Sequence, residues 1–167
     1  MKYKKIIVIA EAGVNHNGNI VNAKRLIDKA SDSGADIIKF QTFKAAKIVT
    51  SKSPKAKYQL KKTNTKESQF EMLKKLELSE NDHKILIKYS KKRKIEFLSS
   101  PFDIQSAKFL NELKVKKVKI ASGEIINYPL LKCIAQLNKF TILSTGMSTV
   151  SEIKNAIKVL LNNGLSK

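Results

Sequence analysis

The 167-residue sequence has no tryptophan, one cysteine, three prolines and six glycines. A single thiol cannot form an internal disulfide, and it excludes a CxxC redox or zinc motif. The scarcity of proline and glycine, with a hydrophobic content of 42%, argues against a linker or a disordered chain. Cys133 lies in a largely apolar stretch, so we expect a buried structural thiol and a reducing compartment.

Long hydrophobic runs are also missing. The apolar segment nearest the N-terminus, Ile6 to Ala10, ends at Glu11 and is too short for a signal peptide or a membrane span. The sequence therefore predicts a soluble cytoplasmic protein without a membrane partner. Walker-type, Gly-x-Gly-x-x-Gly and Gly-x-Ser-x-Gly motifs are absent, and so is a paired-histidine metal motif.

Arginine is scarce although positive charge is abundant. Of the 33 Lys and Arg residues only Arg25 and Arg93 are arginine, and the formal net charge is +19. A basic excess fits nucleic acid, a membrane surface or an anionic substrate. Because base readout and bidentate phosphate binding depend on arginine, we interpret the charge as a solvated lysine-rich surface. A basic nucleic-acid-binding module stays open as an alternative, recognisable by strongly salt-dependent binding.

Short β-branched or aromatic runs alternate with amphipathic segments. Five runs are typical of buried parallel strands: Ile6–Ala10, Ile37–Phe40, Ile95–Leu98, Val118–Ala121 and Phe140–Leu143. Helical patterns cover Asn22–Ala30, Ser68–Leu76, a segment beginning near Ser79, Ile104–Leu113, Leu130–Leu137 and a segment after a capping box at Thr149. The pattern predicts an α/β fold of five βα units. The long polar connection 42–67 is of a kind that is usually a functional lid or disordered.

Polar side chains gather where each predicted strand ends. They are Glu11, Lys39 and Gln41, Ser99 and Ser100, Lys119 with Ser122 and Glu124, and Ser144 with Thr145. The carboxyl ends of parallel strands carry the active sites of (βα)8 barrels and of open α/β sheets. Because side chains alternate along a strand, Lys39 and Gln41 should share one face. A lysine in a buried strand is costly unless it is paired, so we expect Lys39 and Lys119 to hold an anion between them.

Each of these residues also has an ordinary structural interpretation. Glu11 could be the ion-pair partner of either lysine, and Glu124 could stabilise the dipole of the following helix. The serines could be loop or cap hydroxyls. His16 is expected to be structural, and His83, near a helix start, is expected at the surface. The constellation is more specific than any one member.

Five motifs occur in order: Glu11–Gly18 (EAGVNHNG), Ile38–Thr42 (IKFQT), Phe97–Asp103 (FLSSPFD), Val118–Glu124 (VKIASGE) with Asn127–Pro129, and Ile142–Met147 (ILSTGM). Together they resemble the N-acylneuraminate (sialic acid) synthase family over essentially the whole chain. The Ala-Ser-Gly-Glu form is nearer to N-acetylneuraminate and N,N'-diacetyllegionaminate synthases than to pseudaminate synthases. The resemblance implies a TIM-type (βα)8 barrel followed by a small antifreeze-like domain, in a homodimeric full-length enzyme.

The same resemblance implies a transferase. It would condense phosphoenolpyruvate with N-acetylmannosamine or a 2,4-diacetamido-trideoxyhexose, giving a nonulosonic acid and phosphate, with a divalent cation, typically manganese, polarising the sugar aldehyde. The residues implied for phosphoenolpyruvate are Lys39, Lys119, Ser122, Ser144 and Ser100, the last where threonine is common. Glu124 would be the acid/base residue. Glu11 and Gln41 would face the sugar, and Glu11 is a second catalytic candidate.

A (βα)8 barrel needs about 250 residues, whereas this sequence supplies five predicted strands. Residues 1–167 are therefore expected to be the N-terminal portion of the barrel. The resemblance then implies that the metal-binding histidines and the antifreeze-like domain lie beyond Lys167, and that residues 1–167 hold no metal ligand. Unpaired sheet edges predict a chain that is marginally stable or self-associating, and inactive without the remainder. The alternative is a five-stranded doubly wound α/β domain that binds a phosphorylated small molecule at a reversal of strand order.

Overall fold

The fold is an α/β structure built on one parallel sheet. The computed structural model describes residues 6–51, 53–54 and 67–166, so Lys167 and half of the polar connection 42–67 lie outside the described residues. The strands are β1 (Ile9–Gly13), β2 (Ile37–Thr42), β3 (Glu96–Pro101), β4 (Lys117–Ile120) and β5 (Phe140–Leu143). They pair in parallel in the order β1-β2-β3-β4-β5. A doubly wound sheet reverses its order, so the doubly wound alternative is wrong.

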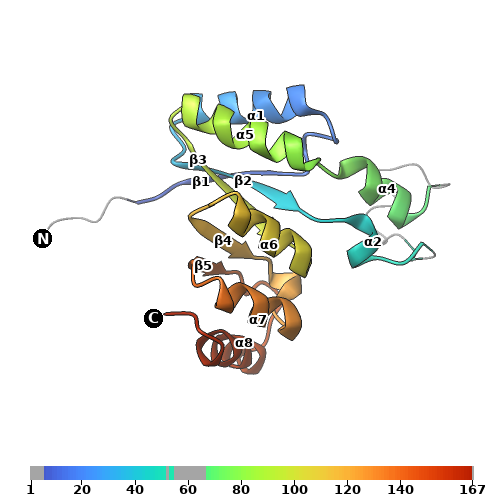
Figure 1. Cartoon of the computed structure of the whole chain (residues 1–167), viewed down its shortest axis with the longest axis vertical. Helices are drawn as coiled ribbons and strands as arrows, with labels where there is room; N and C mark the ends of the chain where they lie inside the picture. The colour runs from blue at the N-terminus through green and yellow to red at the C-terminus, as the bar shows by residue number, and fades with distance from the viewer. Residues whose placement is uncertain (1–5, 52, 55–66, 167) are drawn as a thin grey trace, which may run out of the picture.

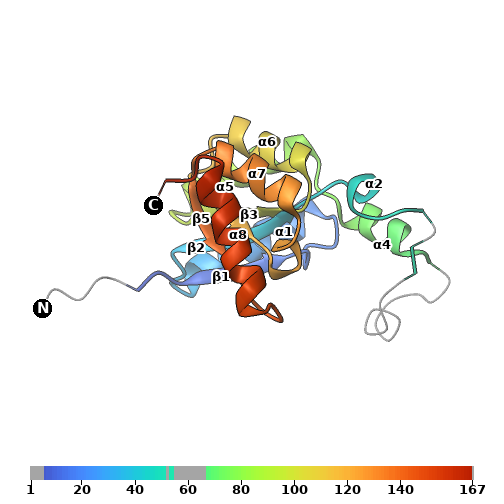
Figure 2. The ribbon, with the colours of Figure 1, turned by 90° about the horizontal axis from the view of Figure 1, so that it is seen from below.

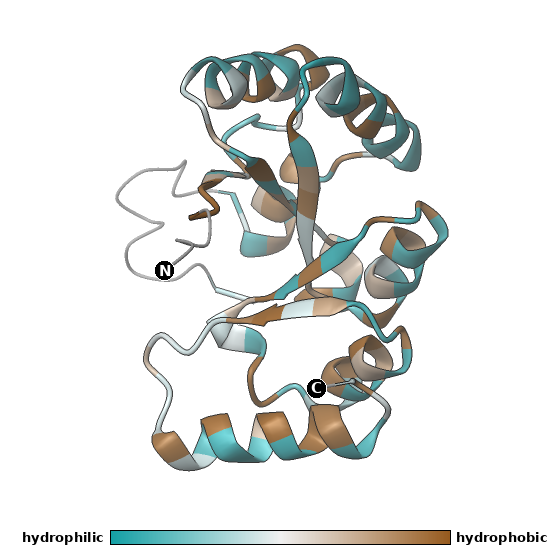
Figure 3. Cartoon of the chain, turned by 90° about the vertical axis from the view of Figure 1, so that its left-hand side faces the viewer, coloured by the Kyte–Doolittle hydropathy of each residue, from teal (hydrophilic) through white to brown (hydrophobic). Residues whose placement is uncertain are grey.

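Helices line one side of the curved sheet (Figures 1 and 3). They are α1 (Ile20–Asp32), α2 (Ala45–Ile48), α4 (Gln69–Leu76), α5 (Glu80–Lys92), α6 (Ile104–Glu112), α7 (Tyr128–Gln136) and α8 (Val150–Asn162), with a 3-10 turn η1 (Ser122–Glu124). α2 and α4 lie beyond the carboxyl end of β2, and α8 is the last helix of the row, at the bottom of Figure 1 and nearest the viewer in Figure 2. No helix within the described ranges is long and apolar enough to cross a membrane.

Two apolar clusters lie between the helices and the sheet. The first includes Ile27 from α1, Phe40 from β2 and Leu86 from α5. The second includes Val118 from β4 and Leu131 from α7. All five side chains are fully buried, and removing such apolar surface from water is the main stabilising term in folding. The clusters fix the helix-covered face of the sheet, which leaves the opposite face for polar residues.

Strand boundaries differ from the sequence prediction most at the start of β1 and at the ends of β2 and β3, and β4 is shifted by one residue. β1 begins at Ile9, because Ile9 pairs with the first residue of β2. Ile6, predicted to start the strand, is 83% exposed. β3 continues through Ser100 to Pro101, because the last two residues of β2 pair with them. Pairing with a neighbouring strand sets these boundaries, and hydrophobic periodicity does not report it.

Helix starts agree with the capping chemistry of the sequence. Thr149 and Glu152 form the predicted capping box of α8. Ser79 caps α5, and Pro129 lies in the first turn of α7, where its missing N–H is tolerated. Cys133 is buried in the second cluster with a free thiol, which confirms its structural assignment.

Candidate anion-binding site

Strand register brings four of the predicted site residues to one face of the sheet. Glu11 of β1 lies beside Lys39 of β2, and Gln41 lies beside Ser100 of β3. Register partners in parallel strands project to the same side, and residues two apart on one strand share a face. The intervening Phe40 belongs to the helix-facing core. The predicted separation of polar and apolar faces is therefore confirmed for β2.

Glu11 and Lys39 form a direct ion pair. Glu11 Oε2 lies 2.6 Å from Lys39 Nζ, and the side chains are 56% and 10% exposed respectively. The pairing expected for a lysine in a buried strand is thus present, and one structural interpretation of Glu11 is confirmed. An incoming anion at Lys39 has to share this lysine with Glu11.

Lys119 of β4 is the second cation of the site. Its pKa lies below the ordinary value for lysine, mainly because the amine is partly buried, and further because Lys39 repels it, while Glu11 acts in the opposite direction. The two lysines and one carboxylate therefore interact and leave one positive charge in excess. A bound anion would stabilise protonated Lys119 and offset the repulsion between the lysines. This arrangement is suited to an anionic ligand.

Ser100 carries a buried hydroxyl group without a partner. The residue is 1% exposed, and Ser100 Oγ has no hydrogen-bond partner among the described residues. A buried hydroxyl without a partner costs free energy. Ser100 shares the polar face of the sheet with Gln41. Its hydroxyl therefore faces the side of the sheet on which the lysines would hold a ligand.

The other predicted site residues lie at the ends of β4 and β5. Ser122 opens η1 and lies against Gly146, where an added Cβ atom would be 3.6 Å from Ser122 Oγ. Ser144 follows directly after β5. Glu124 accepts a hydrogen bond of 2.7 Å from the amide of Asn127. In the described part of the chain, no hydrogen bond or ion pair joins these residues to the lysine–glutamate pair.

Asn127 and Gly13 are site residues to which the sequence reasoning gave no role. Asn127 both caps α7 and orients Glu124. Gly13 has a φ of +55°, and a Cβ atom there would lie 3.1 Å from Glu11 Oε1 and 3.8 Å from Gln41 Nε2. Glu11 and Gln41 thus converge on this glycine. Gly13 could have been recognised from the sequence, because a glycine near the end of a predicted strand often marks a strand irregularity or a close approach of another group to the backbone.

Both histidines are buried behind the site. His16 is completely buried and accepts a hydrogen bond from the backbone of Gly18, as expected for a structural histidine, but its Nε2 has no hydrogen-bond partner among the described residues. His83 is 2% exposed, so the prediction that it lies at the surface is wrong. Its ring packs edge-on against Phe97 and Phe109. The first turn of α5 looks polar in sequence, but His83 is on the side that faces the sheet.

Acid should destabilise the fold through these histidines. Burial is the largest cause that lowers the pKa of both His16 and His83, whereas the unfolded chain takes up protons near pH 6.5. The unfolded state then binds more protons, so the free energy of unfolding falls as the pH drops below that value and levels off below the folded pKa values. The steepest slope is about 1.4 kcal/mol per pH unit for each histidine.

Urea unfolding between pH 7.5 and 5 measures this slope. The matched variant is His83→Gln, which removes one of the two titrating groups, and its slope should be about half that of the wild-type chain. Equal slopes for the two proteins would contradict the assignment of a depressed pKa to His83.

The described residues do not fit a manganese site. Within residues 6–51, 53–54 and 67–166, no group of three or more His, Cys, Asp and Glu side chains could hold a metal ion. Both histidines are enclosed by protein. No chemical step through a metal therefore follows from these residues. The location of the metal ligands beyond Lys167 stays a prediction, and Lys167 itself lies outside the described residues.

Known proteins are similar to this chain in sequence and in fold. A sequence model of the NeuB family matches residues 26–167. The N,N'-diacetyllegionaminic acid synthase of Campylobacter jejuni is 56% identical over 98% of this chain and 49% of its own length. The synthase of the same name from Legionella pneumophila is 48% identical over 95% of this chain and 46% of its own length. The chain thus spans about half the length of these curated relatives.

A solved structure agrees with the sequence relatives. The N-acetylneuraminic acid (sialic acid) synthetase of Leptospira borgpetersenii superposes with a TM-score of 0.80 at 31% identity, over 96% of this chain and 51% of that one. The five motifs at the strand ends led to the same group of proteins, and that prediction is confirmed. The family match covers most of the chain, and the chain belongs to the NeuB family.

Proposed function

We propose that the chain forms the first five βα units of a (βα)8 barrel and that the complete enzyme is a nonulosonic acid synthase. This transferase would join phosphoenolpyruvate to an N-acetylated amino sugar and release phosphate. The uninterrupted order of five parallel strands and the names of the relatives support the proposal. The observation that carries it is the group of Lys39, Glu11 and Lys119 on the polar face that also holds Ser100, whose hydroxyl has no hydrogen-bond partner within the described ranges.

Phosphoenolpyruvate fits this group because it carries two anionic ends. Lys39 and Lys119 would each take an anionic group, and Ser100 Oγ would donate a hydrogen bond to the same ligand. Ser122 and Ser144 would add donors from the ends of β4 and β5. Fixed cations and donors hold a reactant in the reacting geometry and stabilise charge that develops in the transition state.

The sugar would approach from the side of β1 and β2, where Glu11 and Gln41 converge on Gly13. In the proposed reaction, C3 of phosphoenolpyruvate attacks the aldehyde carbon and positive charge develops at C2. Water then adds at C2 and gives one proton to a base, and this proton is passed on to the former aldehyde oxygen, which becomes a hydroxyl group. The C2–O bond to phosphate breaks, C2 becomes a ketone, and the second proton of the water leaves with the phosphate. Glu124, oriented by Asn127, is the proposed base, and Glu11 is the second candidate for proton transfer.

The finer parts of the proposal rest on the relatives and on composition. A 2,4-diacetamido-trideoxyhexose is preferred to N-acetylmannosamine, because both curated relatives reported above are legionaminic acid synthases. Manganese would be held by residues other than those described, which we place beyond Lys167. The complete enzyme is proposed to be a homodimer located in the cytoplasm. The single buried thiol of Cys133 supports a reducing compartment. Neither nucleic acid nor membrane is a proposed partner.

Calorimetric titration of the 167-residue chain with phosphoenolpyruvate tests the binding part of the proposal. We expect saturable binding that inorganic phosphate reduces by competition. Phosphate release should stay at background when manganese and the amino sugar are added, because the proposed metal ligands are outside the described residues. Absence of phosphoenolpyruvate binding would refute the site, and turnover by this chain alone would refute its proposed inactivity.

A further inference from the structure

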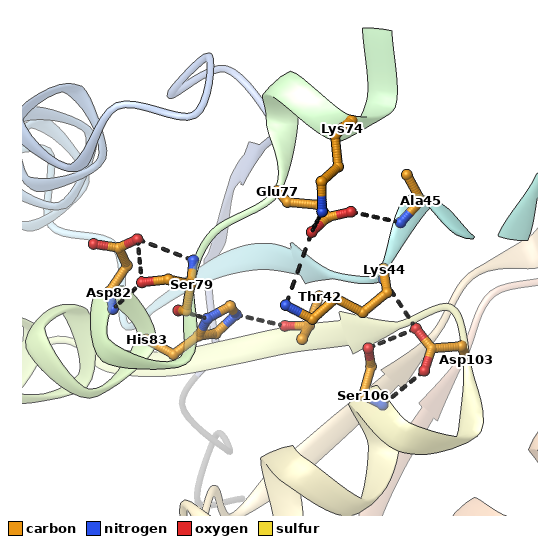
Figure 4. Close-up of polar contacts among 10 residues, drawn as sticks. All are labelled: Thr42, Lys44, Ala45, Lys74, Glu77, Ser79, Asp82, His83, Asp103 and Ser106. Carbon is orange, nitrogen blue, oxygen red and sulfur yellow. Dashed lines mark hydrogen bonds and ion pairs between the residues drawn. The ribbon is translucent and has the colours of Figure 1, made fainter. Parts of the chain in front are cut away.

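The segment that follows Gln41 is held by side chains from three other parts of the fold. His83 reaches it from α5, Glu77 from the link before α5, and Asp103 from the start of α6 (Figure 4). The three side chains contact Thr42, Lys44 and Ala45, which are three of the four residues of the segment 42–45. We call the three side chains and the residues they contact the segment 42–45 clamp. None of the three belongs to the polar face described above.

The first arm of the clamp is a chain of hydrogen bonds through His83, Thr42 and Ser99. For a neutral His83 ring, each donor and each acceptor in this chain can be assigned. His83 Nδ1 lies 2.8 Å from the carbonyl oxygen of Ser79, which can only accept, so this nitrogen carries the proton of the neutral ring. His83 Nε2 must then accept from the hydroxyl of Thr42, at 2.9 Å. Ser99 Oγ in turn donates to Thr42 Oγ1, at 2.6 Å. Because burial lowers the pKa of His83, the neutral ring that this chain requires is favoured.

The other two arms hold the backbone of the same segment. Glu77 accepts a hydrogen bond of 2.8 Å from the backbone N–H of Ala45, and its side chain is only 9% exposed. Asp103 accepts from the backbone N–H of Lys44 at 3.2 Å, and it also accepts from the backbone and hydroxyl of Ser106. Carboxylates that accept from backbone N–H groups form the stronger, charge-assisted kind of hydrogen bond.

An open cavity borders the segment on the helix side, although Phe43 and Ala45 themselves are buried. A cavity of about 400 Å³ lies there, and its lining includes Thr42, Phe43, Lys44, His83 and Phe109. Close-packed side chains resist displacement, whereas an open cavity offers no partner atoms. The hydrogen bonds of the clamp therefore restrain the segment on its cavity side, in addition to the packing of Phe43 against Phe102.

The clamp ends where the candidate site begins. Thr42 directly follows Gln41, and Ser99 directly precedes Ser100. Gln41 and Ser100 are register partners on the polar face. The Thr42–Ser99 bond thus ties the ends of β2 and β3 together from the opposite face of the sheet.

We propose that Thr42 and His83 are positioning residues that hold Gln41 and Ser100 in place for the ligand. The inference rests on the proposed function for the identity of that ligand, but its structural part does not. Thr42→Val keeps the shape of the side chain and removes the hydroxyl. Thr42→Ser keeps the hydroxyl and removes the methyl group. If the hydroxyl matters, serine rescues and valine does not.

The matched control is Tyr89→Phe. Tyr89 also makes a hydrogen bond between α5 and another element, because its hydroxyl donates to Asp28 of α1. This contact lies near the opposite end of α5 from His83 and touches no residue of the site. Tyr89→Phe should lower thermal stability without changing the site.

Two measurements on the 167-residue chain decide the inference. Amide hydrogen exchange in the free protein should accelerate at Ser100 and Ala45 in Thr42→Val, by about tenfold, and stay within twofold of wild type in Thr42→Ser and Tyr89→Phe. The dissociation constant for phosphoenolpyruvate should rise about tenfold in Thr42→Val alone.

The outcomes separate the two proposals. If the wild-type chain does not bind phosphoenolpyruvate, the proposed function fails, and hydrogen exchange still decides whether the clamp holds Ser100. If Thr42→Ser is the damaged variant and Thr42→Val is not, Thr42 acts by packing and the inference is overturned. Unchanged exchange at Ser100 in Thr42→Val overturns it as well.

Discussion

Lys119→Met should strongly weaken anion binding and at the same time raise the stability of the fold. Protonation of Lys119 is less favourable in the folded state, because burial and the charge of Lys39 lower its pKa. The folded state holds this proton less tightly than the unfolded state, whose pKa is near 10.4, so charged Lys119 destabilises the fold at neutral pH. Methionine removes that cost and fits a similar space. Sites that bind ligands often carry such a destabilising charge.

The binding effect should be large. Removing one charged partner of a partly buried contact costs at least about 2 kcal/mol, or roughly 30-fold in affinity. Titration with phosphoenolpyruvate and thermal unfolding at pH 7 measure the two effects together. A Lys119→Met variant that binds normally would contradict the site, and one that is less stable than wild type would contradict the electrostatic argument.

Lys117→Met is the matched control on the same strand and the same face. Lys117 is satisfied by Glu96, since its Nζ lies 2.6 and 2.7 Å from the two carboxylate oxygens. Its removal leaves Glu96 without its partner, so this variant should be less stable than wild type while binding phosphoenolpyruvate normally. The two methionine variants are thus expected to change stability in opposite directions.

Gly18→Ala should be among the most destabilising substitutions in the chain. Gly18 has a φ of +70°, and an added Cβ atom would lie 2.1 Å from the backbone carbonyl oxygen of Lys75 in α4. Such an overlap can be relieved only if α4 or the β1–α1 loop moves. Backbone strain for a non-glycine residue adds to the cost. We expect a loss of about 3 kcal/mol or more in the free energy of unfolding, measured by urea denaturation.

Gly34→Ala separates the overlap from the backbone strain. Gly34 has a similar φ of +77°, but no atom lies within 4 Å of an added Cβ. This control should lose only about 1 kcal/mol. If Gly18→Ala and Gly34→Ala lower the free energy of unfolding equally, the close contact between the β1–α1 loop and α4 does not contribute to the cost of Gly18→Ala.

Local patterns in the sequence determined the elements and the composition of the candidate site. The capping residues Ser79 and Thr149 marked helix starts that the structure confirms. Alternation along β2 assigned Lys39 and Gln41 to one face, also as observed. These features depend on interactions between residues a few positions apart, such as the bonds of a capping box or the pleat of one strand. A sequence carries that information directly.

Only the tertiary structure decided which residues meet. It made Lys39 the ion-pair partner of Glu11 and buried His83 against the sheet. It also left Ser100 Oγ without a hydrogen-bond partner among the residues that the structure describes. Thr42 is 41 positions from His83 and 57 from Ser99, yet it bonds to both. Register and burial of this kind are set by how separate elements pack, and no periodicity within one segment encodes them.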